Sequence, residues 1–444
     1  MPIPGVYTDG ITPSNILYPS DTLYPLSDTV TIIPNTASLD VFSATSIYWF
    51  AQEPSYTSYL NYLNQNVRAT YFKIELLRVV DESVYDTIIS DVINGDGNVN
   101  ISLQEGVRRT CSLSLTNALR EYTTFFSNVG MGNKFKLYLG YLINNKIKWF
   151  PQGVFAFDNP ALISNRSNRY ISLSGTDKWS FLNGQNGGVL NATYIAPMGS
   201  TVIELIRSIL ALNIVSDPIE PLIHTDVSFK TITYDITKQA GETAADLILE
   251  IAYNLSCYVY YDQNGRLVFR PYEEDYLKYP VFSLNNNDFN LLGITKEISL
   301  DQIYNSVQVI ADNVQSSDIP IVAEVINRDL SDPNSFPNYG ILKTYVVTDF
   351  TKGIDSTDLA TARARWELKK VKSKQSNINA NVMALYHVDV NDVVDVTDLS
   401  TGDSKDKYLV TSISLPIGTN SESTMRLLKA NTDEDIGEVV EVIV

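Results

Sequence analysis

Two long stretches of the chain alternate between hydrophobic and polar residues, as strands with one buried face do. In the first stretch the alternating runs are 71–77, 99–103, 111–115, 134–143 and 169–175. In the second they are 306–311, 345–348, 388–396 and 408–415. A strand roughly every 10–15 residues is typical of a β-barrel or β-sandwich, so each stretch is predicted to form one. The Asn-Gly-Asp-Gly-Asn sequence at 94–98 predicts a turn between the first two runs.

The region between these stretches has helical spacing. Apolar residues recur at three- and four-residue intervals over 201–210 and 243–252, and Ser200 or Thr201 suits the N-cap of the first helix. The runs 257–261 and 266–270 then flank an Asn-Gly pair, which supplies the positive φ of a hairpin turn. This order predicts an α+β middle domain.

One more helix is predicted inside the second β stretch. It begins at the acidic turn 355–358 and extends to about Lys370. The lysine-rich segment 369–374 is interpreted as a solvated helix end, where the helix dipole favours positive charge.

The first 66 residues combine many prolines with scattered aromatic residues. Proline disfavours both helices and ladder pairing, yet a fully solvated tail would not carry so many apolar side chains. We therefore expect an extended N-terminal arm that lies on its own barrel or on a neighbouring subunit. Its candidate subunit-interface residues are Tyr7, Tyr18 and Tyr24.

The residues 431–444 begin with acidic side chains and end in a short hydrophobic run. An unpaired strand of this kind is an aggregation hazard, so we expect it to add to a sheet of its own chain or of another subunit. The candidate interface residues in this C-terminal acidic and strand tail are Val439, Val440, Val442 and Ile443.

Composition narrows the class of function. The net charge is −18 and no basic cluster offers a nucleic-acid-binding face, so stable DNA binding is not expected. The 27 tyrosines suit surfaces that are half packed and half wet, which fits either burial against other subunits or a carbohydrate-binding surface. We expect no membrane span, because no run approaches the ~20 apolar residues required, and no secretory signal at the first residues.

Candidate catalytic and metal-binding groups are sparse. The two histidines, His224 and His387, lie in unrelated contexts, and Cys111 and Cys257 are the only cysteines. Neither a zinc site nor a disulfide framework is therefore expected. The acidic triplet 273–275 does not suit a glycosidase, whose two carboxylates stand on separate elements. We predict a protein that is not an enzyme, with no catalytic residue, no metal and no cofactor.

The order of several motifs resembles the bacteriophage tail and baseplate hub protein family. In the first stretch the motifs are the strand end Leu139-Gly140-Tyr141, the turn Pro151-Gln152-Gly153 and the sequence Gly175-Thr176-Asp177-Lys178. In the second stretch they are 303–309, 360–368 and 385–394.

This resemblance implies two tail-tube-like β-barrel domains per chain and a homotrimer that presents six similar barrels to a hexameric tail tube. It also implies a tail tube protein on one face, with a spike or tail-tip protein and other baseplate proteins on the other. DNA would be present only in transit, through a channel with an acidic or neutral wall. The expected location is the virion tail or baseplate, after synthesis in the host cytoplasm.

The predicted fold class is mainly β with α+β. The predicted domains are an arm at 1–66, a first tube-like β-barrel at 67–190, a middle domain at 191–290, a second barrel at 291–430 and a tail at 431–444. The predicted function is a structural hub that joins the tail tube to the tail tip or spike. Two alternatives stay open, a receptor- or glycan-binding tail module and a polysaccharide or cell-wall hydrolase.

Overall fold

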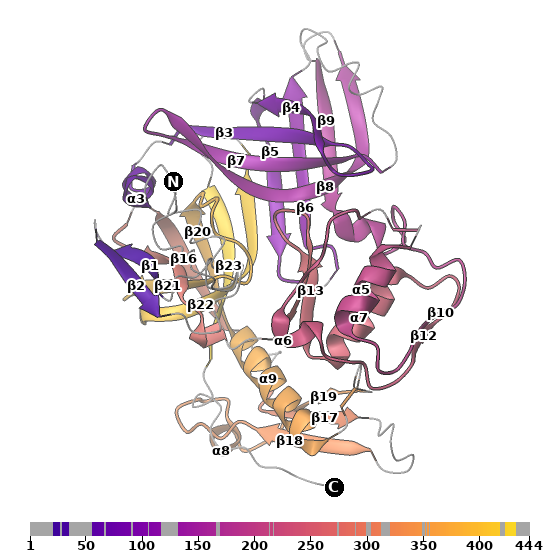
Figure 1. Ribbon diagram of the computed structural model, residues 1–444. Coiled ribbons are helices and arrows are strands. Elements are labelled where there is room, and N and C mark those ends of the chain that lie inside the picture. The colour runs from indigo at the N-terminus through magenta and orange to yellow at the C-terminus, as the bar shows by residue number, and fades with distance from the viewer. Residues whose placement is uncertain are drawn as a thin grey trace.

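The computed structural model is mainly β, with a smaller α+β part, as the sequence predicted (Figure 1). It describes residues 21–26, 29–34, 56–65, 68–89, 92–104, 106–116, 132–165, 169–212, 214–215, 217–272, 275–288, 290–298, 303–311, 320–348, 351, 353–354, 356–417 and 422–431. None of the helices in these ranges is long and apolar enough to cross a membrane.

Seven strands form the first half of a 13-stranded sheet. They are β3 (Thr70–Leu77), β4 (Val84–Ile89), β5 (Val92–Ser102), β6 (Arg109–Thr116), β7 (Lys134–Ile143), β8 (Lys146–Ser164) and β9 (Arg169–Asp177). Their order in the sheet is β5-β6-β9-β8-β7-β3-β4, with antiparallel pairing throughout. Along β6 and β9 every second side chain is buried, which is the alternation that the sequence displayed.

Six further strands form the second half of the same sheet. They are β15 (Pro280–Asn285), β16 (Leu291–Ile298), β20 (Ser376–Met383), β21 (Val393–Asp398), β22 (Asp403–Pro416) and β23 (Glu422–Lys429). β15 pairs in parallel with β21, so the second half recruits a strand that lies before residue 291.

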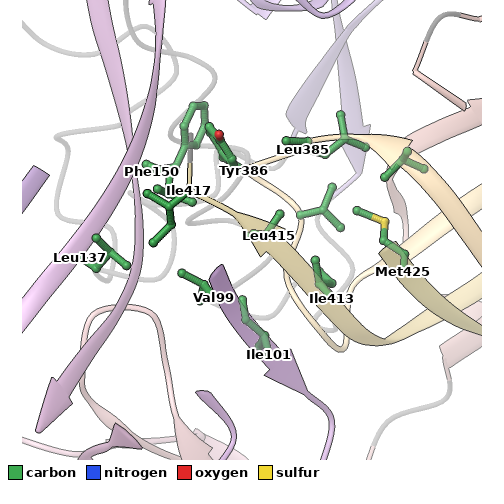
Figure 2. Packing of buried hydrophobic residues seen from close by; sticks show 14 of the residues in the cluster. Val99, Ile101, Leu137, Phe150, Leu385, Tyr386, Ile413, Leu415, Ile417 and Met425 are labelled. Carbon is green, nitrogen blue, oxygen red and sulfur yellow. The ribbon is translucent and has the colours of Figure 1, made fainter. Parts of the chain in front are cut away.

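The two halves are joined by backbone pairing between β5 and β22. The register runs from Ser102 opposite Ser412 to Asn98 opposite Pro416. One large hydrophobic core continues across this junction. In Figure 2 Val99 and Ile101 of β5 lie beside Ile413 and Leu415 of β22. Because strand pairing and core are both shared, the two halves form one packed unit.

The middle region has its own hydrophobic core, two small sheets and several short helices. Its helices are η1 (Lys178–Phe181), α5 (Val202–Leu210), α6 (Thr225–Ser228), α7 (Ala244–Asn254) and η2 (Asp275–Leu277). Its strands are β10 (Tyr194–Ala196), β11 (Leu222–Ile223), β12 (Ile236–Lys238), β13 (Cys257–Tyr261) and β14 (Leu267–Pro271). Thr201 caps α5 and Thr243 caps α7 in a capping box, and Gly265 has φ +74° in the β13–β14 turn. These features confirm the predicted helix starts and hairpin.

A third unit with a separate core is inserted between β16 and β20. It consists of β17 (Ser306–Ala311), β18 (Ile321–Ile326), α8 (Phe336–Tyr339), β19 (Thr344–Val347) and α9 (Thr357–Gln375). Ala360, Ala364 and Leu368, spaced four residues apart on α9, pack against the three-stranded sheet. We call this unit the insert. Figure 1 shows α9 running from the second half of the large sheet to β17, β18 and β19.

Three local predictions were wrong. The turn predicted at 94–98 lies inside β5, where the pairing register with β6 shifts between Val92 and Gly97. The arm holds more regular structure than its prolines indicated, because α3 (Tyr56–Leu63) and a hairpin of β1 (Asp21–Leu26) with β2 (Thr29–Pro34) occur in it. The lysine-rich end of α9 is not simply solvated, since Lys369 is only 7% exposed.

Candidate functional site

The segment 384–392 is the most unusual buried connection of the chain. It links β20 to β21 and was predicted to be part of a strand at 388–396, but β21 begins only at Val393. Seven of its nine residues are buried, namely Ala384, Leu385, Tyr386, His387, Val388, Val390 and Asn391. A buried segment outside a sheet must find other partners for its backbone groups.

Side chains of the first half supply those partners. Arg68 Nη1 donates to the Ala384 carbonyl at 3.0 Å, and the Tyr141 hydroxyl donates to the same oxygen. Gln152 Nε2 donates to the Tyr386 carbonyl at 3.0 Å. These bonds cross between the halves. We call segment 384–392, its first-half partners and the β5–β22 pairing the seam.

Two neighbouring arginines extend the seam at the start of β6. Arg108 Nη2 donates to the Val390 carbonyl at 3.2 Å, and Arg109 forms an ion pair with Asp389. Arg109 Nη1 also donates to the Gln152 carbonyl at 3.0 Å, and this side chain is 1% exposed. A buried guanidinium is costly unless it is paired, so the contacts of Arg109 with Asp389 and the Gln152 carbonyl hold both acceptors in position.

Asp177 holds the backbone that presents these arginines. Its Oδ2 accepts the backbone N–H groups of Arg108 at 2.8 Å and Arg109 at 2.9 Å, while Oδ1 accepts that of Trp179 at 3.1 Å. Burial raises the pKa of the Asp177 carboxyl to about 6, although the three N–H groups act in the opposite direction.

Aromatic packing completes the seam. The rings of Tyr141 and Tyr386 stack with centroids 4.5 Å apart and an interplanar angle of 13°. The Tyr59 hydroxyl and His387 Nδ1 share a hydrogen bond of 2.5 Å. Burial, together with the nearby charge of Arg68, lowers the pKa of His387 to about 3, so this histidine is neutral at pH 7. Figure 2 shows Tyr386 beside Phe150 of β8.

A second set of buried charges joins the first half to the middle region. Lys178 contacts Glu82 at 2.8 Å and Asp217, and donates to the Gly265 carbonyl at 2.9 Å. Lys134 contacts the same Glu82 oxygen at 2.7 Å. Burial lowers the pKa of Lys134, while Glu82 opposes this. Each charge in this network has an opposite charge as a partner, which suits a fixed contact between units.

Most of the predicted subunit-interface residues lie outside the described part of the chain. Tyr7, Tyr18, Val439, Val440, Val442 and Ile443 lie outside the described residues. The backbone of Tyr24 lies in β1 and pairs with Thr31 of β2. Their role at a subunit interface stays a prediction.

The two histidines and two cysteines occupy separate places. His224 caps α6 through Nδ1, and His387 lies in the seam. Cys111 and Cys257 are buried free thiols in different cores. Within the described residues, no three His, Cys, Asp or Glu side chains are grouped as metal ligands.

Sequence reasoning missed the arginines and Gln152 of the seam. Gln152 and the segment 385–394 both belong to motifs on which the family resemblance rests. Nothing in the spacing of these motifs indicated that Gln152 bonds to that segment. An arginine that points into a core has the same local sequence pattern as one that points to solvent.

Comparison with known proteins supports the fold. A family model described as YQBQ-like matches residues 218–428. No curated protein matches the sequence.

Three solved structures are similar in fold. The 43 kDa tail protein of prophage MuSo2 from Shewanella oneidensis is 17% identical, with a TM-score of 0.54 over 82% of this chain and 99% of that one. The tail protein from Neisseria meningitidis MC58 is 15% identical, with a TM-score of 0.56 over 82% and 98%. Prophage tail protein gp18 from Listeria monocytogenes EGD-e is 11% identical, with a TM-score of 0.50 over 82% and 96%. The resemblance predicted from the sequence is thus confirmed, and the chain has the fold of phage tail proteins.

Proposed function

We propose that this chain is a structural virion protein of a phage tail, a hub that joins the tail tube to the tail tip or spike. The observation that carries the proposal is the seam, which holds two large β halves at one fixed angle. A hub must present similar surfaces to a symmetric tube in a constant orientation. The β5–β22 pairing and the shared core meet that requirement, because changing the angle between the halves would break both.

The proposed assembly is a homotrimer, in which three chains present six β halves to a hexameric tail tube protein. The opposite face would bind a spike or tail-tip protein and other baseplate proteins. DNA would pass through the ring without being held, because a chain with a net charge of −18 disfavours retention of a polyanion. In this role the protein acts by binding and has no catalytic step.

The arm and the tail are the proposed contacts between subunits. Tyr7, Tyr18 and Tyr24 would pack on a neighbouring chain, and Val439, Val440, Val442 and Ile443 would extend a neighbouring sheet.

Light scattering after size-exclusion chromatography tests the proposal. The chain, of 49.6 kDa, is mixed with the tail tube protein of the same phage. We expect a complex that contains three copies of this chain. A chain that stays monomeric in the mixture would contradict the hub function.

A matched pair of variants tests the proposed contacts. Replacing Tyr7, Tyr18 and Tyr24 by alanine is expected to reduce trimer formation. Replacing three exposed tyrosines of the described part, Tyr85, Tyr279 and Tyr339, is the control and is expected to leave it unchanged. Equal effects of the two triple variants would refute the arm contact.

A further inference from the structure

A pocket of about 580 Å³ lies where the two β halves, the middle region and the insert meet. Its walls include Ser102 of β5, Tyr260 of β13, Trp366 of α9 and Thr411 of β22. Because the chain has a net charge of −18, an acidic or neutral pocket wall would be expected. Among the described residues, six cationic side chains line it instead, namely Arg108, Lys369, Lys370, Lys374, Arg426 and Lys429, against one acidic side chain, Asp275.

Arg108 shows that the pocket wall is built and not a chance group of surface lysines. This side chain is 2% exposed and its guanidinium lies 3.8 Å from the centre of the Tyr260 ring. Its Nε donates to no atom of the described residues. Its guanidinium, held by the Tyr260 ring and the Val390 carbonyl, is a group that pairs well with carboxylates.

The aromatic wall is also fixed in place. The Trp366 indole stacks on Tyr272 at 3.9 Å with an interplanar angle of 4°, and Lys370 lies 4.6 Å from the Trp366 ring centre. This stack links the insert to the middle region. Anything bound beside it therefore contacts both units at once.

Acidic residues of the same chain follow the pocket residue Asn431 closely in the sequence. Asn431 lines the pocket, and its Nδ2 donates to Ser373 Oγ of α9 at 2.8 Å. The sequence then continues with Asp433, Glu434 and Asp435, and no lysine or arginine occurs from 430 to 444. Since an extended chain spans about 3.3–3.6 Å per residue, the backbone of these three residues can reach at most about 7–14 Å from Asn431.

We propose that this pocket is a binding site for a carboxylate-rich peptide and that its occupant is the acidic sequence Asp433, Glu434 and Asp435 of the same chain. The attraction is electrostatic, between three carboxylates and a wall of six cations, and Arg108 supplies a desolvated donor for one of them. Because the wall comes from all three units, the bound sequence ties the insert and the middle region to the two β halves. This site is separate from the subunit contacts of the proposed function.

A fluorescent label on the acidic sequence tests this directly in the full chain. Ile436→Cys provides one accessible thiol for bimane, because Cys111 and Cys257 are buried and burial raises the pKa of the Cys257 thiol to about 12. Trp366 is the quencher, since a tryptophan quenches bimane only at short range. We expect strong quenching that does not depend on protein concentration and is relieved in 1 M salt.

Three variants of the labelled chain test the assignment. Trp366→Phe should abolish the quenching, and Lys374→Glu with Arg426→Glu should reduce it at least twofold. Lys146→Glu, which reverses the charge of the exposed first residue of β8, is the control and should have no effect. Absent quenching, or quenching that the pocket reversals leave unchanged, would overturn the proposal.

A mixing experiment distinguishes binding of the acidic sequence within one chain from binding between two copies. Labelled Ile436→Cys/Trp366→Phe chain is mixed with unlabelled wild-type chain, so that any quenching must come from another molecule. We expect none. Quenching in this mixture would show that a second copy provides the acidic sequence and would overturn the assignment to the same chain.

Discussion

The seam and the insert are two parts of one chain that are attached in different ways. At the seam the halves share backbone pairing, one hydrophobic core and hydrogen bonds from buried side chains such as Arg68. The insert has its own core, and its contacts with the rest of the chain include the stack of Trp366 on Tyr272 and the bond from the Gly353 N–H to Asn254 Oδ1. The seam therefore resembles the interior of a domain, while the insert contact resembles an interface between domains.

This difference indicates which parts of the chain are held in a fixed relative orientation. A sheet that continues through β5 and β22 cannot change its angle without losing pairing and core contacts together. A contact made by side chains on one helix can change with the loss of a few interactions. We infer that the angle between the halves is constant and that the position of the insert is adjustable.

The largest expected effect comes from a pair of identical core substitutions. Leu415 in the seam core and Leu368 in the insert core are both 0% exposed. Each leucine-to-alanine change should cost about 2–5 kcal/mol. Leu415→Ala should lower the denaturation midpoint of both halves together, whereas Leu368→Ala should increase hydrogen exchange only in β17–β19 and α9. The same exchange pattern for both variants would remove the distinction between the two regions.

Removing a buried charge at the seam should have the next largest effect. Arg109→Met leaves Asp389 and the Gln152 carbonyl without their donor, at a cost of about 3 kcal/mol measured by urea unfolding. Arg169→Met changes an exposed arginine of β9 and should stay within about 0.5 kcal/mol of the wild type. Comparable values for the two substitutions would mean that Arg109 does not hold the seam.

The contact between Trp366 of the insert and Tyr272 of the middle region should stabilise the chain less than the Arg109 contacts at the seam do. Trp366→Ala removes the stack on Tyr272 and the nearby cations, and should cost about 1–2 kcal/mol, while Trp366→Phe should restore part of this. Proteolysis of the native chain should become faster at the insert and remain unchanged within the halves. A cost as large as that of Arg109→Met would argue that the insert is held as firmly as the seam.

The last prediction concerns the dependence of stability on pH. His387 is neutral in the folded chain because its pKa is lowered to about 3, whereas it titrates near 6.5 when unfolded. Its contribution to stability is therefore present above pH 6.5 and is lost as pH falls toward 3. Across this range the wild type should lose stability more steeply than His387→Gln, by at most about 1.4 kcal/mol per pH unit, in urea titrations at fixed pH. Parallel pH curves would contradict a buried neutral histidine at the seam.

The sequence predicted what depends on local pattern. The cap at Thr201, the helix that starts near Thr243 and the turn at Gly265 were recognisable because a few neighbouring residues determine them. The segment 388–396 shows where this reasoning fails. Val388 and Val390 are buried as the alternation predicts, yet the first residues of the segment are not in a strand, because the Val390 carbonyl accepts a bond from Arg108, 282 positions away.

The candidate site was less predictable than the fold for the same reason. Partners that are distant in the sequence, such as Arg109 and Asp389, leave no periodic pattern that would pair them. The lysines near Lys369 were interpreted as a solvated helix end, since the pocket that they line exists only after three units come together.

Electron cryomicroscopy of this chain bound to the tail tube protein of its phage tests the central claim most directly. The proposed hub predicts a ring of three chains in which six β halves contact the tube, with β5 still paired to β22 in every chain as in the structure of the chain alone. A ring in which only one half of each chain meets the tube, or in which the β5–β22 pairing has opened, would contradict it.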